Sequence, residues 1–166
     1  MTPSYTLRSL DPARDDLTNY LSWMQDEDSN SFIESVNRNY SLEKLIEFID
    51  SKNHSVDCIL LGIFTSSEQL HIGNLKFESI SKKEKRAVLG MLIGDLKSRG
   101  KGIGAQILPF AFLKMRKEFG IEIIELGVNS ENHPALSLYK KVGFEIVSPY
   151  GEGGFWMRKL IIETHD

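Results

Sequence analysis

The sequence predicts an α/β fold in which a mixed, mostly antiparallel sheet is flanked by helices. Apolar residues alternate along some segments and recur at helical spacing along others, in the order β-α-α-β-β-β-α-β-α-β-β. This order contains one βαβ crossover among antiparallel neighbours, which implies a mixed sheet covered by helices. The chain has 166 residues, of which 41% are hydrophobic and 26% are charged. We therefore expect one domain over residues 1–166, large enough to bury a sizeable core.

The first part of the chain predicts a strand followed by helices. Residues 5–10 alternate like a first strand, and Asp11-Pro12 predicts a helix start with an N-cap and a proline at the first helical position. Residues 26–40 are acidic and polar, and apolar residues at 32–36 suggest one or two helical turns within them. Ser41 caps a clearer helix. The apolar stripes of the two main helices are Leu17, Tyr20, Leu21 and Met24, and then Leu42, Leu45, Ile46 and Ile49.

The rest of the chain alternates between strand and helix periods. The predicted strands are Val56–Thr65, Leu70–Ile80, Ala87–Ile93, Ile121–Val128, Phe144–Val147 and Phe155–Ile162. One helix follows a glycine-rich loop, with a core-facing stripe of Leu108, Phe112, Met115 and Phe119. Pro109 should kink this helix, because it cannot donate to the carbonyl of Ala105. A shorter helix over 132–142 ends at Gly143.

Charge and composition exclude several classes of protein. The net charge of −3 carries no basic surplus, so we expect no nucleic-acid partner. Cys58 is the single cysteine and lies in an apolar run, which predicts a small core residue and excludes an internal disulfide. The four histidines share no metal-ligand spacing, so no metal site is indicated. Without a signal peptide or a membrane-length apolar stretch, we expect a cytoplasmic protein with no membrane partner.

The most informative segment is Arg99-Gly100-Lys101-Gly102-Ile103-Gly104, which opens a predicted helix. Its three glycines leave backbone N–H groups that no side chain covers, at the positive end of the helix dipole. Arg99 and Lys101 add positive charge beside them. The segment therefore predicts a pyrophosphate-binding loop.

Two familiar phosphate loops fit this segment poorly. A nucleoside-triphosphate loop needs G-x-x-x-x-G-K-[ST], but Gly94 and Gly100 enclose five residues and Gly102 occupies the hydroxyl position. Gly100, Gly102 and Ala105 fit the dinucleotide fingerprint G-x-G-x-x-A. In that fingerprint, however, the turn leaves its strand at once, whereas six residues separate Ile93 from Gly100 here.

A third possibility accounts for more of the chain: residues 88–147 resemble the GNAT superfamily of acetyl-CoA-dependent N-acetyltransferases. The family signature R/Q-x-x-G-x-G/A is present as residues 99–104. The family segment N-x-x-A-x-x-L-Y-x-K-x-G-F follows as residues 132–144. The N-terminal part, with Leu7–Leu10, Trp23 and Ile72–Leu75, is similar to the RimJ/RimL-type branch.

The resemblance implies how acetyl-CoA binds. The central strands Val88–Ile93 and Glu122–Val128 of a twisted sheet splay apart, and the pantetheine arm pairs with freed backbone groups near Leu92 and Ile93. The pyrophosphate lies on N–H groups of the loop, which are those of Gly100, Lys101, Gly102, Ile103, Gly104 and Ala105, beside Arg99. Asn132 matches a position that contacts the cofactor, and it also suits a helix N-cap.

The implied reaction is attack of a neutral amine on a thioester. Backbone N–H groups near Leu92 and Ile93 can stabilise the oxyanion. Tyr139 matches the family tyrosine that protonates the departing thiolate, and its alternative role is to pack its ring in the core.

No residue is identified as the general base. Some relatives carry an acid twelve residues before the tyrosine or on the strand at 87–90, where this chain has Gly127 and Val88. Glu78, His71 and Glu125 are candidates by residue type alone, and each is more typical of a surface or hydrogen-bonded strand residue. We therefore favour deprotonation through water. The acids Asp26, Glu27, Asp28 and Glu34 could attract a cationic amine, although a solvated loop explains them as well.

The sequence thus predicts an acetyl-CoA-dependent N-acetyltransferase with acetyl-CoA as co-substrate. The acceptor is a small-molecule or peptide primary amine, namely a protein N-terminus, an amino sugar or a polyamine. Residues 23–40 and the hairpin 148–155 should line the acceptor pocket. A non-catalytic acyl-CoA-binding module is the alternative, and a homodimer is left open as the assembly.

Overall fold

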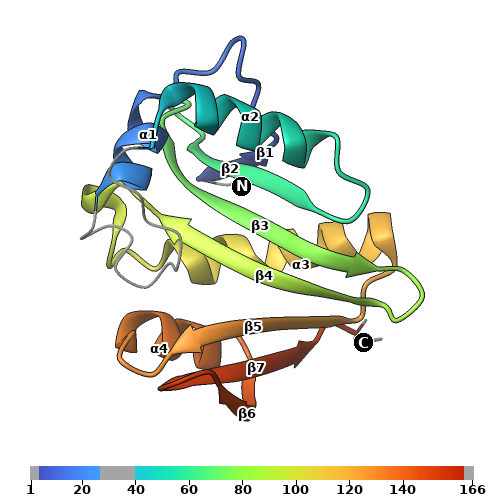
Figure 1. The fold of residues 1–166 in the computed structure, drawn as a ribbon. Coiled ribbons are helices and arrows are strands. Elements are labelled where there is room, and N and C mark those ends of the chain that lie inside the picture. Colours follow the sequence, from blue (N-terminus) through green and yellow to red (C-terminus); the bar gives the residue numbers. More distant parts are fainter. Residues whose placement is uncertain (1–3, 27–39, 163–166) are drawn as a thin grey trace. The chain divides into compact units, whose positions relative to one another are not determined.

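The computed structural model describes residues 4–26 and 40–162. Its strands form a mixed seven-stranded sheet in the order β1-β2-β3-β4-β5-β7-β6 (Figure 1). The strands are β1 Tyr5–Arg8, β2 Ile59–Thr65, β3 His71–Ser81, β4 Arg86–Ile93, β5 Ile123–Asn129, β6 Glu145–Tyr150 and β7 Gly154–Leu160. The α-helices are α1 Thr18–Gln25, α2 Leu42–Asn53, α3 Ile103–Phe119 and α4 His133–Lys141, with a 3₁₀ turn η1 at Leu96–Ser98. The predicted mixed fold is confirmed.

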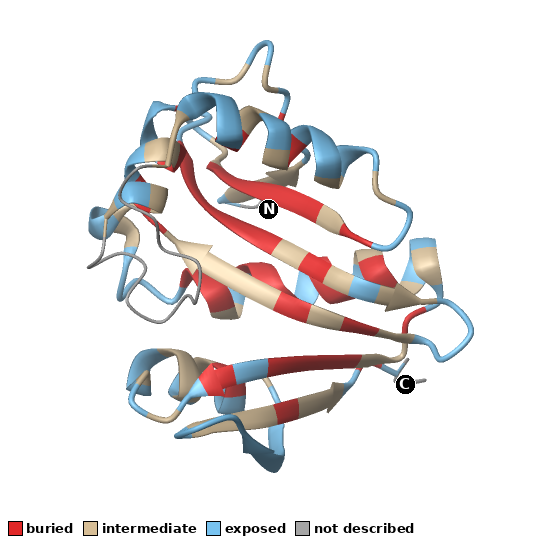
Figure 2. Ribbon diagram, in the orientation of Figure 1, coloured by how far each residue is buried: buried red, intermediate tan, exposed pale blue. Residues whose placement is uncertain are grey.

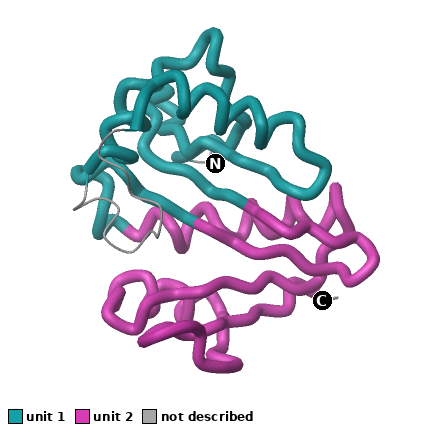
Figure 3. The backbone as a smooth tube through the Cα atoms, viewed as in Figure 1, with its two compact units in different colours: residues 1–76, 91–101 teal, residues 77–90, 102–166 magenta. Residues whose placement is uncertain are grey.

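The chain divides into two compact units, which are described separately (Figure 3). Unit 1 comprises residues 1–76 and 91–101, and unit 2 comprises residues 77–90 and 102–166. None of the helices in the described ranges is long and apolar enough to cross a membrane.

Unit 1 is built on the antiparallel pair β1–β2, which runs from Tyr5–Thr65 to Arg8–Gly62. Figure 2 shows buried residues along β2 and the first half of β3. Helix α2 begins as predicted, because the Ser41 side chain accepts a hydrogen bond from the Lys44 backbone N–H at 3.2 Å. Helices α1 and α2 both add apolar side chains to the core of unit 1. The core residues are Leu10, Leu17, Tyr20, Trp23, Leu45, Ile49, Leu60 and Phe64.

Unit 2 combines one parallel strand pair with two antiparallel pairs. The parallel pairing of β4 with β5 runs from Arg86–Ile123 to Val88–Glu125. Strand β7 pairs along all of β5, and β6 forms an exposed edge with a register shift between Ile146 and Ser148. Helices α3 and α4 contribute the buried residues Ile103, Gly104, Ile107, Leu108, Ala111, Phe112, Met115 and Tyr139.

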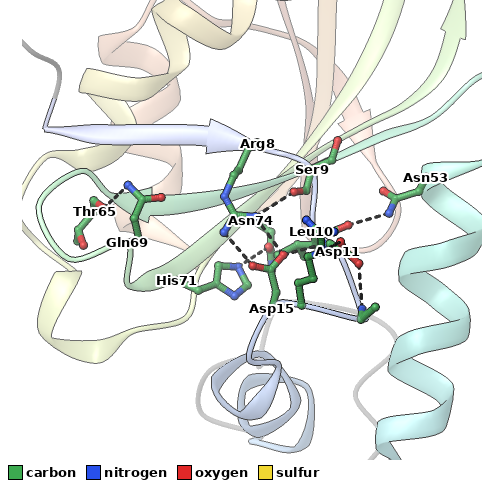
Figure 4. A network of polar contacts seen from close by, with 12 residues as sticks. Arg8, Ser9, Leu10, Asp11, Asp15, Asn53, Thr65, Gln69, His71 and Asn74 are labelled. Carbon is green, nitrogen blue, oxygen red and sulfur yellow. Dashed lines mark hydrogen bonds and ion pairs between the residues drawn. The ribbon is translucent and has the colours of Figure 1, made fainter.

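The predicted start of the first helix was wrong. Helix α1 begins at Thr18, because residues 11–15 form a tight turn instead. The Asp11 carboxylate accepts from the Ala13 backbone at 2.9 Å, so it closes a local turn rather than capping a helix. Asp15 is held by Arg8 across the turn, with a shortest distance of 2.8 Å (Figure 4). Burial and hydrogen bonding to a distant arginine thus override the local helix signal.

Two other predictions about helices have different outcomes. Helix α3 continues through Pro109, whose exposed position leaves the Ala105 carbonyl able to bond water. The helical turns predicted at 32–36 lie outside the described residues.

His71 is buried among aromatic rings in unit 1. Its ring stacks on Phe64 at 4.9 Å between centroids and meets the edges of Trp23 and Tyr20. Nε2 lies 2.9 Å from the Gly73 carbonyl and 2.8 Å from Asn74 Oδ1, two acceptors, so Nε2 carries the proton (Figure 4). Burial lowers the pKa of His71, although its hydrogen bonds partly oppose this. The histidine is therefore neutral and structural, which argues against a role as catalytic base.

The buried neutral His71 should make the protein acid-sensitive. Unfolded histidine binds a proton near pH 6.5, whereas folded His71 does so only at lower pH. The free energy of unfolding is therefore complete above about pH 6.5 and falls below it, by at most about 1.4 kcal/mol per pH unit. Urea unfolding at pH 7.5 and 5.0 measures the loss, which His71→Phe should reduce. The exposed His54→Gln is the control and should keep the wild-type loss; equal losses in wild type and His71→Phe would contradict the assignment.

Candidate active site

The glycine loop turns the chain sharply into α3. Gly100 has φ +73° and Gly102 has φ +71°, a left-handed conformation that side chains rarely adopt. A Cβ added at either position would meet no atom within 4 Å. The backbone conformation, and not a lack of space, is therefore what requires glycine at these two positions.

The first turn of α3 offers free backbone donors. Gly102 is the N-cap and supplies no side-chain cap, and no acidic residue lies in the first turn. The first intrahelical bond joins the Gln106 N–H to the Gly102 carbonyl at 3.3 Å. The N–H groups of residues 103–105 precede that bond, so they are available to an anion at the positive end of the dipole.

Gly104 has a different reason to be glycine. A Cβ at this position would lie 2.5 Å from Cδ2 of Leu138 on α4. The third glycine of the motif therefore allows α3 and α4 to pack closely within unit 2. The expectation that all three glycines serve only to uncover N–H groups was incomplete, because tertiary packing accounts for Gly104.

The segment that leads from β4 to the loop is braced in unit 1. Arg99 Nε donates to the Ile93 carbonyl at 2.8 Å, so this exposed arginine ties the loop back to the end of β4. A Cβ at Gly73 would lie 2.3 Å from the Leu92 carbonyl oxygen, which shows how closely β3 approaches Leu92. Leu92 and Ile93 themselves are half-buried, and Lys101 is exposed. Binding of acetyl-CoA by these residues stays a prediction.

Asn132 caps helix α4. Its Oδ1 accepts a hydrogen bond from the Ala135 N–H at 3.3 Å. The structural role weighed for this residue is thus confirmed, and its contact with the cofactor stays a prediction.

Tyr139 is held in place by the way α4 ends. Gly143 adopts φ +104° and the Phe144 N–H returns to the Tyr139 carbonyl at 2.9 Å. This turn brings the Phe144 ring edge-on to the Tyr139 ring, with 5.7 Å between centroids. Tyr139 is only 6% exposed, and burial raises its pKa to about 12. The phenol therefore keeps its proton through the pH range in which amines become neutral.

Glu125 is not placed to act as a base. It is buried, and both carboxylate oxygens accept hydrogen bonds from other side chains of unit 2. Oε1 lies 3.0 Å from Arg86, and Oε2 lies 2.9 Å from both Trp156 Nε1 and Arg158 Nη2. Burial alone would raise the pKa of Glu125, but these hydrogen bonds and the two arginine charges lower it. The carboxylate is thus an ionised structural anchor.

The other positions considered for the general base are 78, 88 and 127, and none of them holds a side chain that the structure identifies as a base. Glu78 is half-buried on β3, and Val88 carries no ionisable group. The space over Gly127 is taken by a ring, because a Cβ there would lie 2.8 Å from Tyr150 Cε1. Sequence reasoning missed this ring and the partners of Glu125, although it favoured a hydrogen-bonded strand residue at that position. The one available signal was an acid within the apolar run of residues 123–126.

Of the predicted acceptor pocket, the structure describes only part. Trp23 is buried in the unit 1 core, and residues 27–39 lie outside the described ranges. The hairpin 148–155 belongs to unit 2 and is largely exposed.

Comparisons with known proteins identify the family to which most of the chain, including the loop and α4, is similar. The family described as acetyltransferase (GNAT) domain matches residues 9–150. The N-acetyltransferase 9-like protein of Schizosaccharomyces pombe is 29% identical over 146 residues, which cover 76% of this chain and 67% of the relative. The protein of the same name from Caenorhabditis briggsae is 26% identical over 139 residues, covering 78% of this chain and 69% of the relative.

Solved structures show the same fold. Spermidine N-acetyltransferase from Vibrio cholerae, in complex with CoA and spermine, has a TM-score of 0.83 at 20% identity, over 95% of each chain. The PaiA N-acetyltransferase from Thermoplasma acidophilum, in complex with coenzyme A, has a TM-score of 0.74 at 26% identity, over 95% of this chain and 99% of that one. The similarity to the RimJ/RimL branch stays a prediction. The chain belongs to the GNAT family and is an acetyl-CoA-dependent N-acetyltransferase.

Proposed function

We propose that the protein transfers the acetyl group of acetyl-CoA directly to a primary amine, with Tyr139 as general acid. The observation that carries this proposal is the contact of Gly104 with Leu138. It joins the N-terminus of α3, a site suited to phosphate, to the helix that carries Tyr139 one residue further on. The loop residues from Arg99 to Ala105, with Asn132, would hold the cofactor, and N–H groups near Leu92 and Ile93 would stabilise the oxyanion.

The proposed reaction needs only the amine, the thioester, Tyr139 and water. The amine nitrogen attacks the thioester carbonyl carbon, and the electron pair of the C=O bond moves to oxygen. Collapse of this intermediate breaks the C–S bond, and the sulfur takes the Tyr139 proton. The nitrogen loses its proton to water, since Glu125 is held by other side chains and His71 is buried among aromatic rings. Solvent then returns a proton to Tyr139.

The acceptor is a small molecule or a peptide with a primary amine. A polyamine is supported by the spermidine N-acetyltransferase that shares the fold, and a protein N-terminus by the RimJ/RimL resemblance. An amino sugar is the third class. We propose that residues 1–166 act as a single domain, because β3 and β4 each contribute residues to both units. Assembly as a homodimer belongs to the same proposal.

Gly102→Ala should weaken CoA binding. A side chain forced into the left-handed region costs about 1–2 kcal/mol and disturbs the N–H groups at the start of α3. We expect the Kd of CoA, measured by titration calorimetry, to rise about tenfold.

Gly120→Ala is the matched control for that variant. Gly120 caps the other end of α3 with φ +66° and equally open space, so the same strain arises away from the loop. It should lower stability to a similar degree and leave the Kd of CoA unchanged. A similar loss of CoA affinity in both variants would show that strain, and not the loop, is responsible.

Tyr139→Phe should lower kcat about a hundredfold or more, because general acid catalysis supplies that order of rate. The Kd of CoA should stay within about twofold, since the phenyl ring keeps the packing against Phe144. Tyr20→Phe removes the hydroxyl of another buried tyrosine and should keep wild-type turnover. Equal turnover in the two variants would reject the role of Tyr139.

The pH profile of the wild type offers a further check on Tyr139. Because the pKa of Tyr139 is raised to about 12, kcat/KM should rise as the amine is deprotonated and show no falling limb from this tyrosine below pH 10. A falling limb near pH 8 or 9 that disappears in Tyr139→Phe would contradict the assigned state of the phenol.

A further inference from the structure

We infer that Tyr150 and Trp156 form an aromatic wall that binds the acceptor, and that buried Glu125 positions Trp156. This inference rests on the proposed function and narrows the acceptor to amines that carry an aromatic or broad apolar group close to the nitrogen. All residues of the wall and its support belong to unit 2.

The two rings lie together on one face of the sheet of unit 2. Trp156 stands opposite Gly127 in the β5–β7 register, so its side chain leaves the sheet on the side where Gly127 has none. Tyr150 covers that empty position, and its ring lies 5.2 Å from the Trp156 ring at an interplanar angle of 38°. The absence of a side chain at Gly127 thus leaves the space that the Tyr150 ring fills next to Trp156.

The wall is not needed to fill the core. The residues that alternate with Gly127 and Trp156, namely Leu126, Val128 and Met157, are buried on the other face. Tyr150 is 50% exposed and Trp156 is half-buried. Adjacent aromatic rings with open surface are more typical of a binding surface than of a structural element.

The position of the wall points to the acceptor. Gly127 stands twelve residues before Tyr139, where some members of the family carry an acid, and the Tyr150 ring covers it here. The pairing of β4 with β5 ends at Val88–Glu125 among the described residues, and two residues further each strand has a glycine, Gly90 and Gly127. The Tyr150 ring thus occupies the position of that acid, which is why we place the acceptor amine beside the wall.

The Glu125 carboxylate holds the indole of Trp156 through a hydrogen bond. Its Oε2 accepts the Trp156 Nε1 hydrogen at 2.9 Å, which fixes the plane of the indole. Arg158 and Arg86 bind the same carboxylate, so Glu125 stays ionised and cannot move to meet an ammonium group. A buried carboxylate with this many donors is best explained by the orientation it imposes on its partners.

The chemistry of the wall selects the acceptor class. The two arginines next to the wall, Arg86 and Arg158, are both paired with the Glu125 carboxylate. The open ring surfaces, which pack against flat or apolar groups, are therefore the main attraction that this face offers. We infer that the acceptor is an arylalkylamine.

The test compares acetylation of phenethylamine, n-butylamine and spermidine by the full-length enzyme. We expect kcat/KM for phenethylamine to exceed that for n-butylamine at least tenfold, and to exceed that for spermidine. Trp156→Leu and Tyr150→Leu should each abolish most of this preference and leave the Kd of CoA within twofold. Leu160→Ala, on the same strand and 57% exposed, is the control and should change neither quantity.

The positioning role of Glu125 has its own readout. Glu125→Gln should raise KM for phenethylamine severalfold, leave kcat for n-butylamine within twofold and leave the acetyl-CoA KM unchanged. In a Trp156→Phe background, which keeps a ring but removes the indole N–H, Glu125→Gln should have little further effect on KM. A hundredfold loss of kcat with every amine would instead identify Glu125 as the base and overturn the positioning role.

The outcomes distinguish a failure of the aromatic wall from a failure of the proposed acetyltransferase function. If spermidine or n-butylamine is acetylated as well as phenethylamine, or the leucine variants keep the preference, the aromatic wall is rejected and the proposed function stands. If none of the three amines, a peptide with a free N-terminus or glucosamine is acetylated, although CoA binds, the proposed function fails and the aromatic wall fails with it.

Discussion

The contact between Gly104 and Leu138 is the constraint on which the candidate site in unit 2 depends. A Cβ at position 104 would overlap Cδ2 of Leu138, so any residue other than glycine would require the Leu138 side chain to shift. Leu138 precedes Tyr139, and Gly143 and Phe144 complete the support of its ring. The absence of a Cβ at position 104 thus lets the first turn of α3 lie against α4, the helix that carries Tyr139.

Glycine has two physically distinct tasks in the loop. At Gly100 and Gly102 it permits left-handed backbone with nothing nearby, whereas at Gly104 it permits close helix packing. A substitution in the first pair would act through strain in the loop, and one at Gly104 through the position of α4. The same residue type in one short motif therefore supports both the conformation of the loop and the packing of α3 against α4.

Buried ionisable groups in both units serve structure before chemistry. His71 is neutral among aromatic rings, and Glu125 is ionised between two arginines and an indole. Burial favours the neutral form of each, but only Glu125 has charged partners that reverse this preference. Both side chains look like catalytic bases by residue type. The donors around Glu125 and the burial of His71 explain why neither is placed to take a proton from an amine.

The order of the strands and helices, the loop that opens α3 and the donor substrate could all be predicted from the amino-acid sequence. These rest on local properties, namely the apolar period, the Ser41 cap, the glycine at the end of α4 and two short motifs. The start of α1, the close packing at Gly104 and the contacts of Glu125 and Tyr150 emerge only in the folded chain. Those outcomes depend on contacts between residues far apart in the chain, such as Glu125 with Arg86 and Trp156. Periodicity and spacing report which face a residue occupies, but they do not report which distant side chain it meets there.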